Sequence, residues 1–251
     1  MLTRVKNPTE IKAMRESGKQ LATVLAYLKK TIRAGMTTKD IADLAAEKLK
    51  TLGGKPAFLG YYGFPDVICI SLNDEVVHGI PSKDRIINDG DIVSLDFGVK
   101  VDGMITDAAI SVIVGKRSNS PKQKLVDTTE ASLLAGIHTL KDGVQVGTIA
   151  SAIEEVLNEH KFGIVRDLVG HGVGHELHED PNIPNYGRAH TGMKLQEGMT
   201  IAIEPMATMG GHAVYTDSDG WTIKTSDQTL AAHFEHTVLI TKTGFEILTA
   251  L

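Results

Sequence analysis

The sequence predicts an α+β protein made of two similar halves, each with helices followed by antiparallel strands. The segments AGMTTKDIADLAAEKLKTLG and DGVQVGTIASAIEEVLNEHKFG begin at positions 34 and 142, an offset of 108. The segments NDGDIVSLDFG and QEGMTIAIEPM repeat this offset, because Gly90 precedes Asp96 and Gly198 precedes Glu204 by the same six positions. Two elements with one offset indicate an internal duplication.

Each half is expected to contain two amphipathic helices. Apolar residues at helical spacing predict a first helix around residues 17–30 and its counterpart at 124–140. The second helix of each half starts near Ile41 or Ile149, after a glycine-containing entry.

The duplication also predicts how the chain is divided. We expect one domain over residues 1–251, with pseudo-repeats at approximately 10–120 and 121–251. Asp96 and Glu204, at equivalent positions, would then meet across a pseudo-twofold axis at the centre of the molecule.

A β-hairpin is predicted from DIVSLDFGV and GMITDAAISVIVG, with its turn centred between Val101 and Asp102. Opposite residues then have a constant index sum, so Asp96 would face Asp107 with Cα atoms about 4.5–5.5 Å apart. Directly opposed like charges are destabilising. We interpret the two acids as ligands of a divalent cation between them, and a solvated pair at a strand edge is the alternative.

Three further polar residues lie in apolar or glycine-rich stretches. Glu204 lies in a predicted strand, MTIAIEPM, and Glu235 opens another, HFEHTVLIT. Each alone is typical of an acid at a sheet edge. His171 lies in VGHGVGHELHEDP, whose glycines disfavour a helix and suit a loop folded over a site. An HExxH zinc helix is absent from the sequence, because HELH has the wrong spacing.

Together these residues indicate a shared metal site. Carboxylates are rarely buried unless they are paired or bound to metal. The charge of four carboxylates balances that of two divalent metal ions, and two neighbouring metal ions lower the pKa of a water that bridges them. Oxygen-rich ligands with one imidazole suit Co, Mn, Fe or Zn. The set is Asp96, Asp107, His171, Glu204 and Glu235.

Composition excludes several classes of protein. The 251 residues are 42% hydrophobic and 23% charged, as in ordinary globular proteins. A net charge of −5 and a pI near 6.1 argue against specific nucleic-acid binding. The single cysteine, Cys69, excludes an intramolecular disulfide. No apolar run approaches the roughly 18 residues of a membrane span, and the N-terminus lacks a signal-type apolar region. We therefore expect a soluble, cytoplasmic protein without a membrane partner.

Six separated motifs occur in the order and spacing of one family. They are KNPTEIKAMRESG, YYGFPDVICISLNDEVVHGIP, DIVSLDFGVKVDGMITDAAIS, GHGVGHELHEDPNIPNYG, EGMTIAIEPM and DGWTIKTSDQTLAAHFEHTVLIT. Over nearly its whole length the chain resembles the type I methionine aminopeptidases of the pita-bread fold. That fold has the internal twofold pseudo-symmetry expected above. The short interval of 26 positions from His178 to Glu204 leaves no room for the inserted segment of type II enzymes.

The resemblance implies a role for each predicted ligand. Asp96 and Asp107 would ligate one metal. Asp107 would bridge to a second metal, which His171, Glu204 and Glu235 complete. Glu235 would be the other bridging carboxylate.

The resemblance also implies the catalytic groups. His78 would contact the region of the scissile amide nitrogen, and His178 would stabilise the developing oxyanion. Glu204 would accept the proton of the attacking water. A tetrahedral intermediate needs a donor beside the metals, and a proton must reach the leaving amine.

A methionine side-chain pocket is implied as well, and ordinary core packing is the alternative. Phe64 stands where the family usually has tyrosine, Leu177 where an aromatic is frequent, and His175 where arginine is also common. These departures affect fine substrate preference. The implied substrate-binding residues are Phe58, Tyr61, Phe64, Cys69, His78, Leu177, His178 and Trp221.

The expected activity is that of a metallo-exopeptidase. It would remove the initiator methionine from nascent proteins with a small second residue, as a water activated by two metals attacks the scissile carbonyl. The expected partners are the N-terminal peptides of nascent proteins and the ribosome, and the chain is expected to be a monomer. One alternative is a proline-specific peptidase (prolidase or aminopeptidase P), which normally carries an N-terminal domain ahead of the position where this chain begins. The other is a non-catalytic pita-bread binding protein, although such relatives lose ligands that this chain keeps.

Overall fold

The computed structural model describes residues 5–116 and 120–251. The predicted domain and pseudo-repeat limits therefore include residues 1–4 and 117–119, which lie outside the described residues. The helices are α1 (Pro8–Thr31), α2 (Thr38–Leu52), α3 (Pro121–His138) and α4 (Val146–Glu159), with a 3₁₀ turn η1 (Tyr61–Gly63). None of the described helices is long and apolar enough to cross a membrane.

Fifteen strands are present in the described residues. They are β1 (Lys55–Pro56), β2 (Cys69–Leu72), β3 (Glu75–Val77), β4 (Ile92–Val101), β5 (Met104–Ile113), β6 (Gly163–Ile164), β7 (Gly170–Gly172), β8 (Glu179–Ile183), β9 (Thr200–Ile203), β10 (Met206–Thr208), β11 (Val214–Thr216), β12 (Ile223–Thr225), β13 (Ala231–His233), β14 (Glu235–Ile240) and β15 (Phe245–Ile247).

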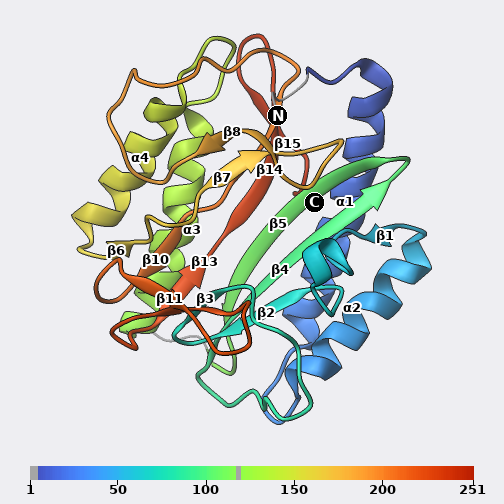
Figure 1. Cartoon of the computed structure of the whole chain (residues 1–251), viewed down its shortest axis with the longest axis vertical. Helices are drawn as coiled ribbons and strands as arrows, with labels where there is room; N and C mark the ends of the chain where they lie inside the picture. Colours follow the sequence, from blue (N-terminus) through green and yellow to red (C-terminus); the bar gives the residue numbers. More distant parts are fainter. Residues whose placement is uncertain (1–4, 117–119) are drawn as a thin grey trace.

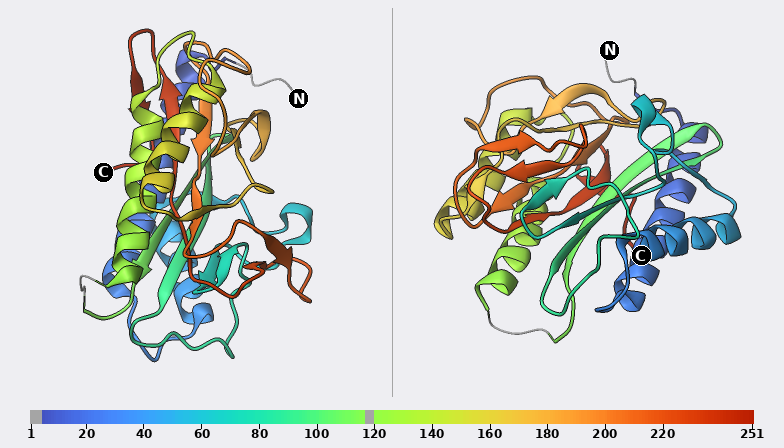
Figure 2. Two further views of the ribbon diagram at one scale, coloured as in Figure 1. Left: turned by 90° about the vertical axis from the view of Figure 1, so that its left-hand side faces the viewer. Right: turned by 60° about the horizontal axis from the view of Figure 1, so that its bottom comes forward.

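The large sheet has nine strands, with β1-β4-β5-β14-β9-β7-β8 in order, β2 added beside β4 and β15 beside β14. All its pairings are antiparallel. Two three-stranded sheets, β13-β10-β6 and β11-β12-β3, accompany it. The pairs α1/α2 and α3/α4 flank the centre of the large sheet (Figure 1), and the short β11 region lies on the other side from α3 and α4 (Figure 2, left). The predicted α+β class with an antiparallel sheet is confirmed.

The offset of 108 has a counterpart in the backbone. Helices α2 and α4 begin at Thr38 and Val146, which are 108 positions apart. Strands β4 and β9 begin at the same offset, at Ile92 and Thr200. Two isolated bridges also recur at this offset, Thr37 with Ile86 and Gln145 with Lys194. These equivalences agree with an internal duplication, and the boundary between the halves stays a prediction.

Helix α1 begins well before the predicted residue 17. Asn7 caps it, because its side chain accepts the N–H groups of Thr9 and Glu10 while the Glu10 carboxylate accepts the N–H of Asn7. Pro8 occupies the first helical position. The predicted start was wrong because apolar periodicity alone does not report a capping box.

The predicted register of the hairpin was wrong by two residues. Asp102 and Gly103 both have positive φ, 48° and 86°, as in a type I′ turn, so Val101 pairs with Met104. Asp96 therefore faces Ala109, and Asp107 faces Gly98. An even shift preserves the side-chain alternation of a strand. The two acids are therefore diagonal neighbours on one face of the hairpin.

That face points away from α1. Leu95 and Phe97 of β4 pack in the cluster formed with α1 and α2. On β5, Thr106 points the same way, because its Oγ1 lies 2.8 Å from the Ser17 Oγ of α1. Since side chains alternate along a strand, Asp96 and Asp107 lie on the opposite face of the sheet.

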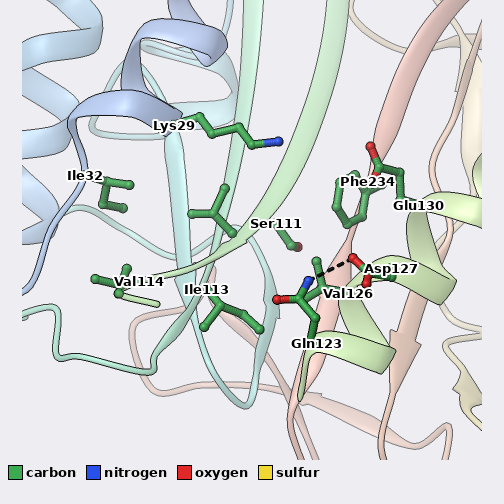
Figure 3. Close-up of a pocket in the computed structure, with 12 residues that line it drawn as sticks. Lys29, Ile32, Ser111, Ile113, Val114, Gln123, Val126, Asp127, Glu130 and Phe234 are labelled. Carbon is green, nitrogen blue, oxygen red and sulfur yellow. Dashed lines mark hydrogen bonds between the residues drawn. The ribbon is translucent and has the colours of Figure 1, made fainter. Parts of the chain in front are cut away.

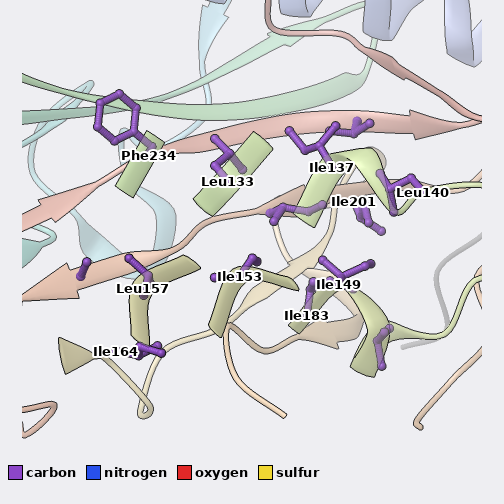
Figure 4. Packing of buried hydrophobic residues seen from close by; sticks show 14 of the residues in the cluster. Leu133, Ile137, Leu140, Ile149, Ile153, Leu157, Ile164, Ile183, Ile201 and Phe234 are labelled. Atoms are coloured by element: carbon purple, nitrogen blue, oxygen red, sulfur yellow. The ribbon is translucent and has the colours of Figure 1, made fainter. Parts of the chain in front are cut away.

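The second helix pair packs in the same manner. Leu133 and Ile137 of α3 and Ile149 and Ile153 of α4 are buried together with Ile201 of β9 (Figure 4). At about 25 cal/mol per Å² of buried apolar surface, such clusters supply most of the driving force for folding. They hold β9 and β14 beside the hairpin, where the site residues meet.

Candidate metallopeptidase site

One cavity of about 260 Å³ contains every predicted site residue. Its walls come from β2, β4, β5, β7 and β14 and from the loops beside them. It is lined by Phe58, Tyr61, Tyr62, Phe64, Cys69, His78, Asp96, Asp107, His171, Leu177, His178, Glu204, Trp221 and Glu235.

The five predicted ligands converge at the polar end of this cavity. Ligand atoms of Asp107, His171 and Glu235 lie within 4.8 Å of one another. Glu204 Oε1 lies 3.4 Å from His171 Nε2. Among the described residues, one carboxylate oxygen each of Asp96, Asp107 and Glu235 is buried without a hydrogen-bond donor. Buried acceptors of this kind fit a divalent cation, whose charge offsets their desolvation.

Two of the predicted ligands lie in local structures other than those expected. Glu204 was expected inside a strand, but it follows the end of β9 and precedes Pro205 and β10. Proline removes the N–H that a continuous ladder would need. His171 was expected in a loop, but it lies in β7 and pairs with Ala202. Glu235 opens β14 as predicted.

Strand β14 connects the predicted ligands of the hairpin with those that follow in the sequence. Glu235 pairs with Ala109 of β5, and Ala109 also pairs with Asp96. Thr237 Oγ1 accepts the N–H of Asp107 at 2.8 Å and donates to its carbonyl at 2.7 Å. The carboxylates are therefore held by a paired backbone, which fixes their separation before any ion binds.

The imidazole of His171 has a different neighbour at each ring nitrogen. Its Nδ1 lies 3.0 Å from the carbonyl oxygen of Gly172, and a carbonyl can only accept, so Nδ1 carries the proton. The bare Nε2 then faces Glu204. Metal-binding histidines generally use one nitrogen for a carbonyl or carboxylate and the other for the ion.

Burial shifts the acid–base equilibria of the cluster. It raises the pKa of Asp107 to about 7, and it raises the pKa values of Asp96 and Glu235 well above the usual range, with neighbouring carboxylates adding to both. Burial also raises the pKa of Glu204. For His171 the effect has the opposite sign: burial lowers the pKa of the imidazole to about 3, because it disfavours the charged imidazolium. A metal ion binds ionised carboxylates and a neutral imidazole. The acids must therefore lose their protons when an ion binds, whereas His171 is already neutral.

The metal-free protein is therefore expected to lose stability as pH rises from about 6.5 to 8. The cluster carboxyls ionise near pH 4 in the unfolded chain, whereas burial keeps them protonated to higher pH in the folded chain. Stability then falls by about 1.4 kcal/mol per pH unit for each carboxyl still protonated. The buried histidines, with lowered pKa values, oppose this trend only below about pH 6.5.

Thermal unfolding of protein that a chelator has freed of metal, followed from pH 6.5 to 8, measures this loss of stability. A saturating divalent cation should flatten the pH dependence, because it binds the ionised carboxylates. A melting temperature of the chelated protein that is constant or rises from pH 6.5 to 8 contradicts this prediction.

Aromatic and apolar side chains form the other end of the cavity. The ring of Phe64 meets Trp221 edge to face at 5.2 Å between centroids. Cys69 pairs with Asp96 across β2 and β4 and is buried, which raises the pKa of its thiol. Leu177 is buried in one apolar cluster with Phe64 and Cys69. These aromatic and apolar side chains therefore line the same cavity as the carboxylates.

Two histidines, His78 and His178, line the cavity together with its polar and apolar residues. The Tyr61 hydroxyl lies 2.8 Å from His178 Nδ1, and the His178 ring meets His171 edge to face at 4.3 Å. His78 has a left-handed backbone (φ 61°), and burial lowers the pKa of its imidazole to about 4. Both side chains line the cavity, as predicted.

Sequence reasoning missed two residues of this region. Tyr62 lines the cavity beside Tyr61, and the two glycines that flank the Tyr-Tyr pair were the available signal. His233 is buried with Nε2 at 3.8 Å from Glu204 Oε2. Its position two residues before Glu235 in an apolar strand could have identified it.

A second cavity lies between α1 and α3 (Figure 3). Lys29 borders it from α1. On α3, the Gln123 amide donates to Asp127 at 2.8 Å. None of the predicted site residues lines this cavity. The chemistry is therefore concentrated on the other face of the sheet.

Comparison with known proteins agrees with this geometry. The model of metallopeptidase family M24 matches residues 12–242. The chain belongs to metallopeptidase family M24. It is 46% identical to methionine aminopeptidase 1 of Bacillus subtilis over 97% of this chain and 98% of that protein. It is 45% identical to the methionine aminopeptidase of Clostridium acetobutylicum, over 98% of each.

Solved structures show the same relation. A methionine aminopeptidase from Thermotoga maritima superimposes with a TM-score of 0.97, 46% identity and full coverage of both chains. The prolidase from Pyrococcus furiosus matches with a TM-score of 0.78 at 24% identity, over 98% of this chain and 65% of its own. That second likeness shows the shared pita-bread fold alone. The expected fold and family are confirmed.

Proposed function

We propose that the chain is a metal-dependent methionine aminopeptidase that removes the N-terminal methionine from peptides with a small second residue. One observation carries this proposal: five metal-binding side chains converge at the end of a cavity whose other walls are aromatic and apolar. The family and the near full-length similarity to methionine aminopeptidases support it.

The donor set suits two divalent ions. Asp96 and Asp107 would hold one ion, His171 and Glu204 would hold the other, and Asp107 and Glu235 would lie within reach of both. When bound, the ions supply a water of lowered pKa and a Lewis acid for the scissile carbonyl. Four carboxylates and one imidazole give little selectivity among Co, Mn, Fe and Zn.

The protein's own groups supply donors and proton acceptors. If the Tyr61 hydroxyl donates to Nδ1 of His178, the His178 Nε2 keeps its proton and can donate to a developing oxyanion. His78, neutral at physiological pH, can bond near the scissile nitrogen. We assign Glu204 as the acceptor of the water's proton, which it can pass toward the leaving amine.

The apolar end accounts for the preference for methionine. A thioether is polarisable and makes favourable contacts with aromatic edges, of about 0.3–1.5 kcal/mol each. Phe64 and Trp221 present such edges, and Cys69 and Leu177 add apolar surface. We expect an unbranched side chain to fit this end of the cavity better than a β-branched one.

Proline-specific hydrolysis and a non-catalytic role are the two competing functions. The prolidase likeness supports the fold alone. Retention of all five donors and both cavity histidines argues against loss of catalysis. Ribosome binding, a monomeric state and a cytoplasmic location stay predictions.

Substrate comparison tests the proposed function. Purified protein with added divalent metal should release methionine from Met-Gly-Met but not from Met-Leu peptides, and should not cleave X-Pro peptides. Preferential cleavage of X-Pro bonds would assign the proline-specific alternative. Absence of hydrolysis under every metal would assign the binding role.

A further inference from the structure

A buried ion pair joins the N-terminal segment to the loop that carries His178. Lys6 Nζ lies 2.7 Å from Glu179 Oε2, and the two side chains are 0% and 4% exposed. The N–H of Lys6 also donates to the carbonyl of Gly198 at 2.8 Å. Two charges that are both removed from water must be matched closely, so this contact has a defined geometry.

The second carboxylate oxygen of Glu179 shapes the loop itself. Glu179 Oε1 accepts the backbone N–H of His175 at 2.7 Å and that of Glu176 at 3.1 Å. Leu177 and His178, between these amides and Glu179, both line the cavity. One side chain therefore closes the turn that presents both residues.

The approach of the N-terminal segment depends on Gly174. A Cβ at this position would lie 2.4 Å from Lys6 Cε, and the glycine has φ +149°. A second polar contact lies nearby, because His175 Nε2 is 2.8 Å from Glu10 Oε1. The other oxygen of Glu10 accepts the N–H of Asn7 in the cap of α1. The start of α1 and the loop are therefore joined at two points.

We propose that Lys6 and Glu179 are positioning residues, whose ion pair holds the loop so that the His178 imidazole faces the reacting carbonyl. This inference rests on the proposed function. Replacing a buried ion pair by apolar side chains often leaves stability unchanged or raises it. The specific contribution here is geometric, since Glu179 contacts Lys6 with one carboxylate oxygen and the two loop amides with the other. Tyr61 fixes the opposite edge of the His178 ring.

A double-mutant cycle between Lys6 and His178 tests the proposal. Lys6→Met is expected to lower kcat by about 10- to 100-fold, the scale of an ångström-sized misplacement, with a smaller change in KM. If Lys6 acts through His178, the loss caused by His178→Ala should shrink by a similar factor in the Lys6→Met background. Arg15→Met is the matched control, because it breaks an exposed ion pair between Arg15 of α1 and Glu246 of β15, outside the cavity. It should leave kcat and the His178→Ala effect unchanged.

A second variant removes the risk of misfolding. Lys6→Met combined with Glu179→Gln leaves no unpaired buried charge and retains an oxygen for the two amides. Hydrogen exchange at the amides of His175 and Glu176 should be faster in both variants than in the wild type. This readout needs no turnover, so it stays informative even if the wild type releases no methionine, a result that would reject the proposed function instead. Unchanged exchange, or an undiminished His178→Ala effect in both variants, overturns the positioning role.

Discussion

Asp107→Asn is expected to lower kcat for methionine release by about 10³-fold or more. Asp107 is one of three residues whose ligand atoms lie within 4.8 Å of one another, and its backbone is fixed by Thr237. A neutral amide is a poor ligand at a shared position. Loss of about 4 kcal/mol of transition-state stabilisation by the metal site corresponds to roughly 10³-fold in rate.

The same variant should lower activity but raise the thermal stability of the metal-free protein. Burial raises the pKa of Asp107 to about 7, so the stability that its neutral carboxyl allows is lost as pH rises from about 4 to 7 and is absent at pH 8. Asp107→Asn should therefore raise the melting temperature of chelated protein at pH 8 while weakening metal binding. Asp102→Asn, on the exposed turn of the same hairpin, is the control and should alter neither property. Wild-type turnover with full metal content in Asp107→Asn would contradict the ligand assignment.

His178→Ala is expected to lower kcat by roughly 10²–10³, the scale found on removing one oxyanion donor. The His178 ring lies against His171 at the polar end of the cavity and is held by the Tyr61 hydroxyl. A donor used mainly in the transition state affects kcat more than KM. Metal content should stay at the wild-type level, because His178 is outside the ligand set.

Steady-state kinetics with a Met-Gly peptide, together with metal analysis, measure this effect. His212→Ala is a suitable control, since His212 is exposed and does not line the cavity. Turnover of His178→Ala within a few-fold of wild type removes His178 from its proposed role. A loss explained entirely by missing metal would move it to the ligand set.

Local chemistry was the most predictable part of the site. Asp96 and Asp107 each interrupt an apolar strand and Glu235 opens one, and this conflict between charge and surroundings marks them without knowledge of the fold. The pocket residues and His78 depended on the resemblance, because aromatic and histidine side chains are as common in ordinary cores. All thirteen predicted residues line one cavity.

Backbone details were less predictable. The hairpin register depended on whether Asp102 and Gly103 both adopt positive φ, a property of the turn that strand periodicity does not encode. The ending of β9 before Glu204 could have been read from Pro205. The Lys6–Glu179 pair spans 173 positions, and no local pattern reports a contact over that distance.

The most direct test of the two-metal peptidase assignment is a metal titration of exhaustively chelated protein, with methionine release and bound metal measured together. The account predicts no release from metal-free protein, and activity that grows with bound cation toward two ions per chain. Undiminished methionine release from protein with no detectable bound metal would contradict it.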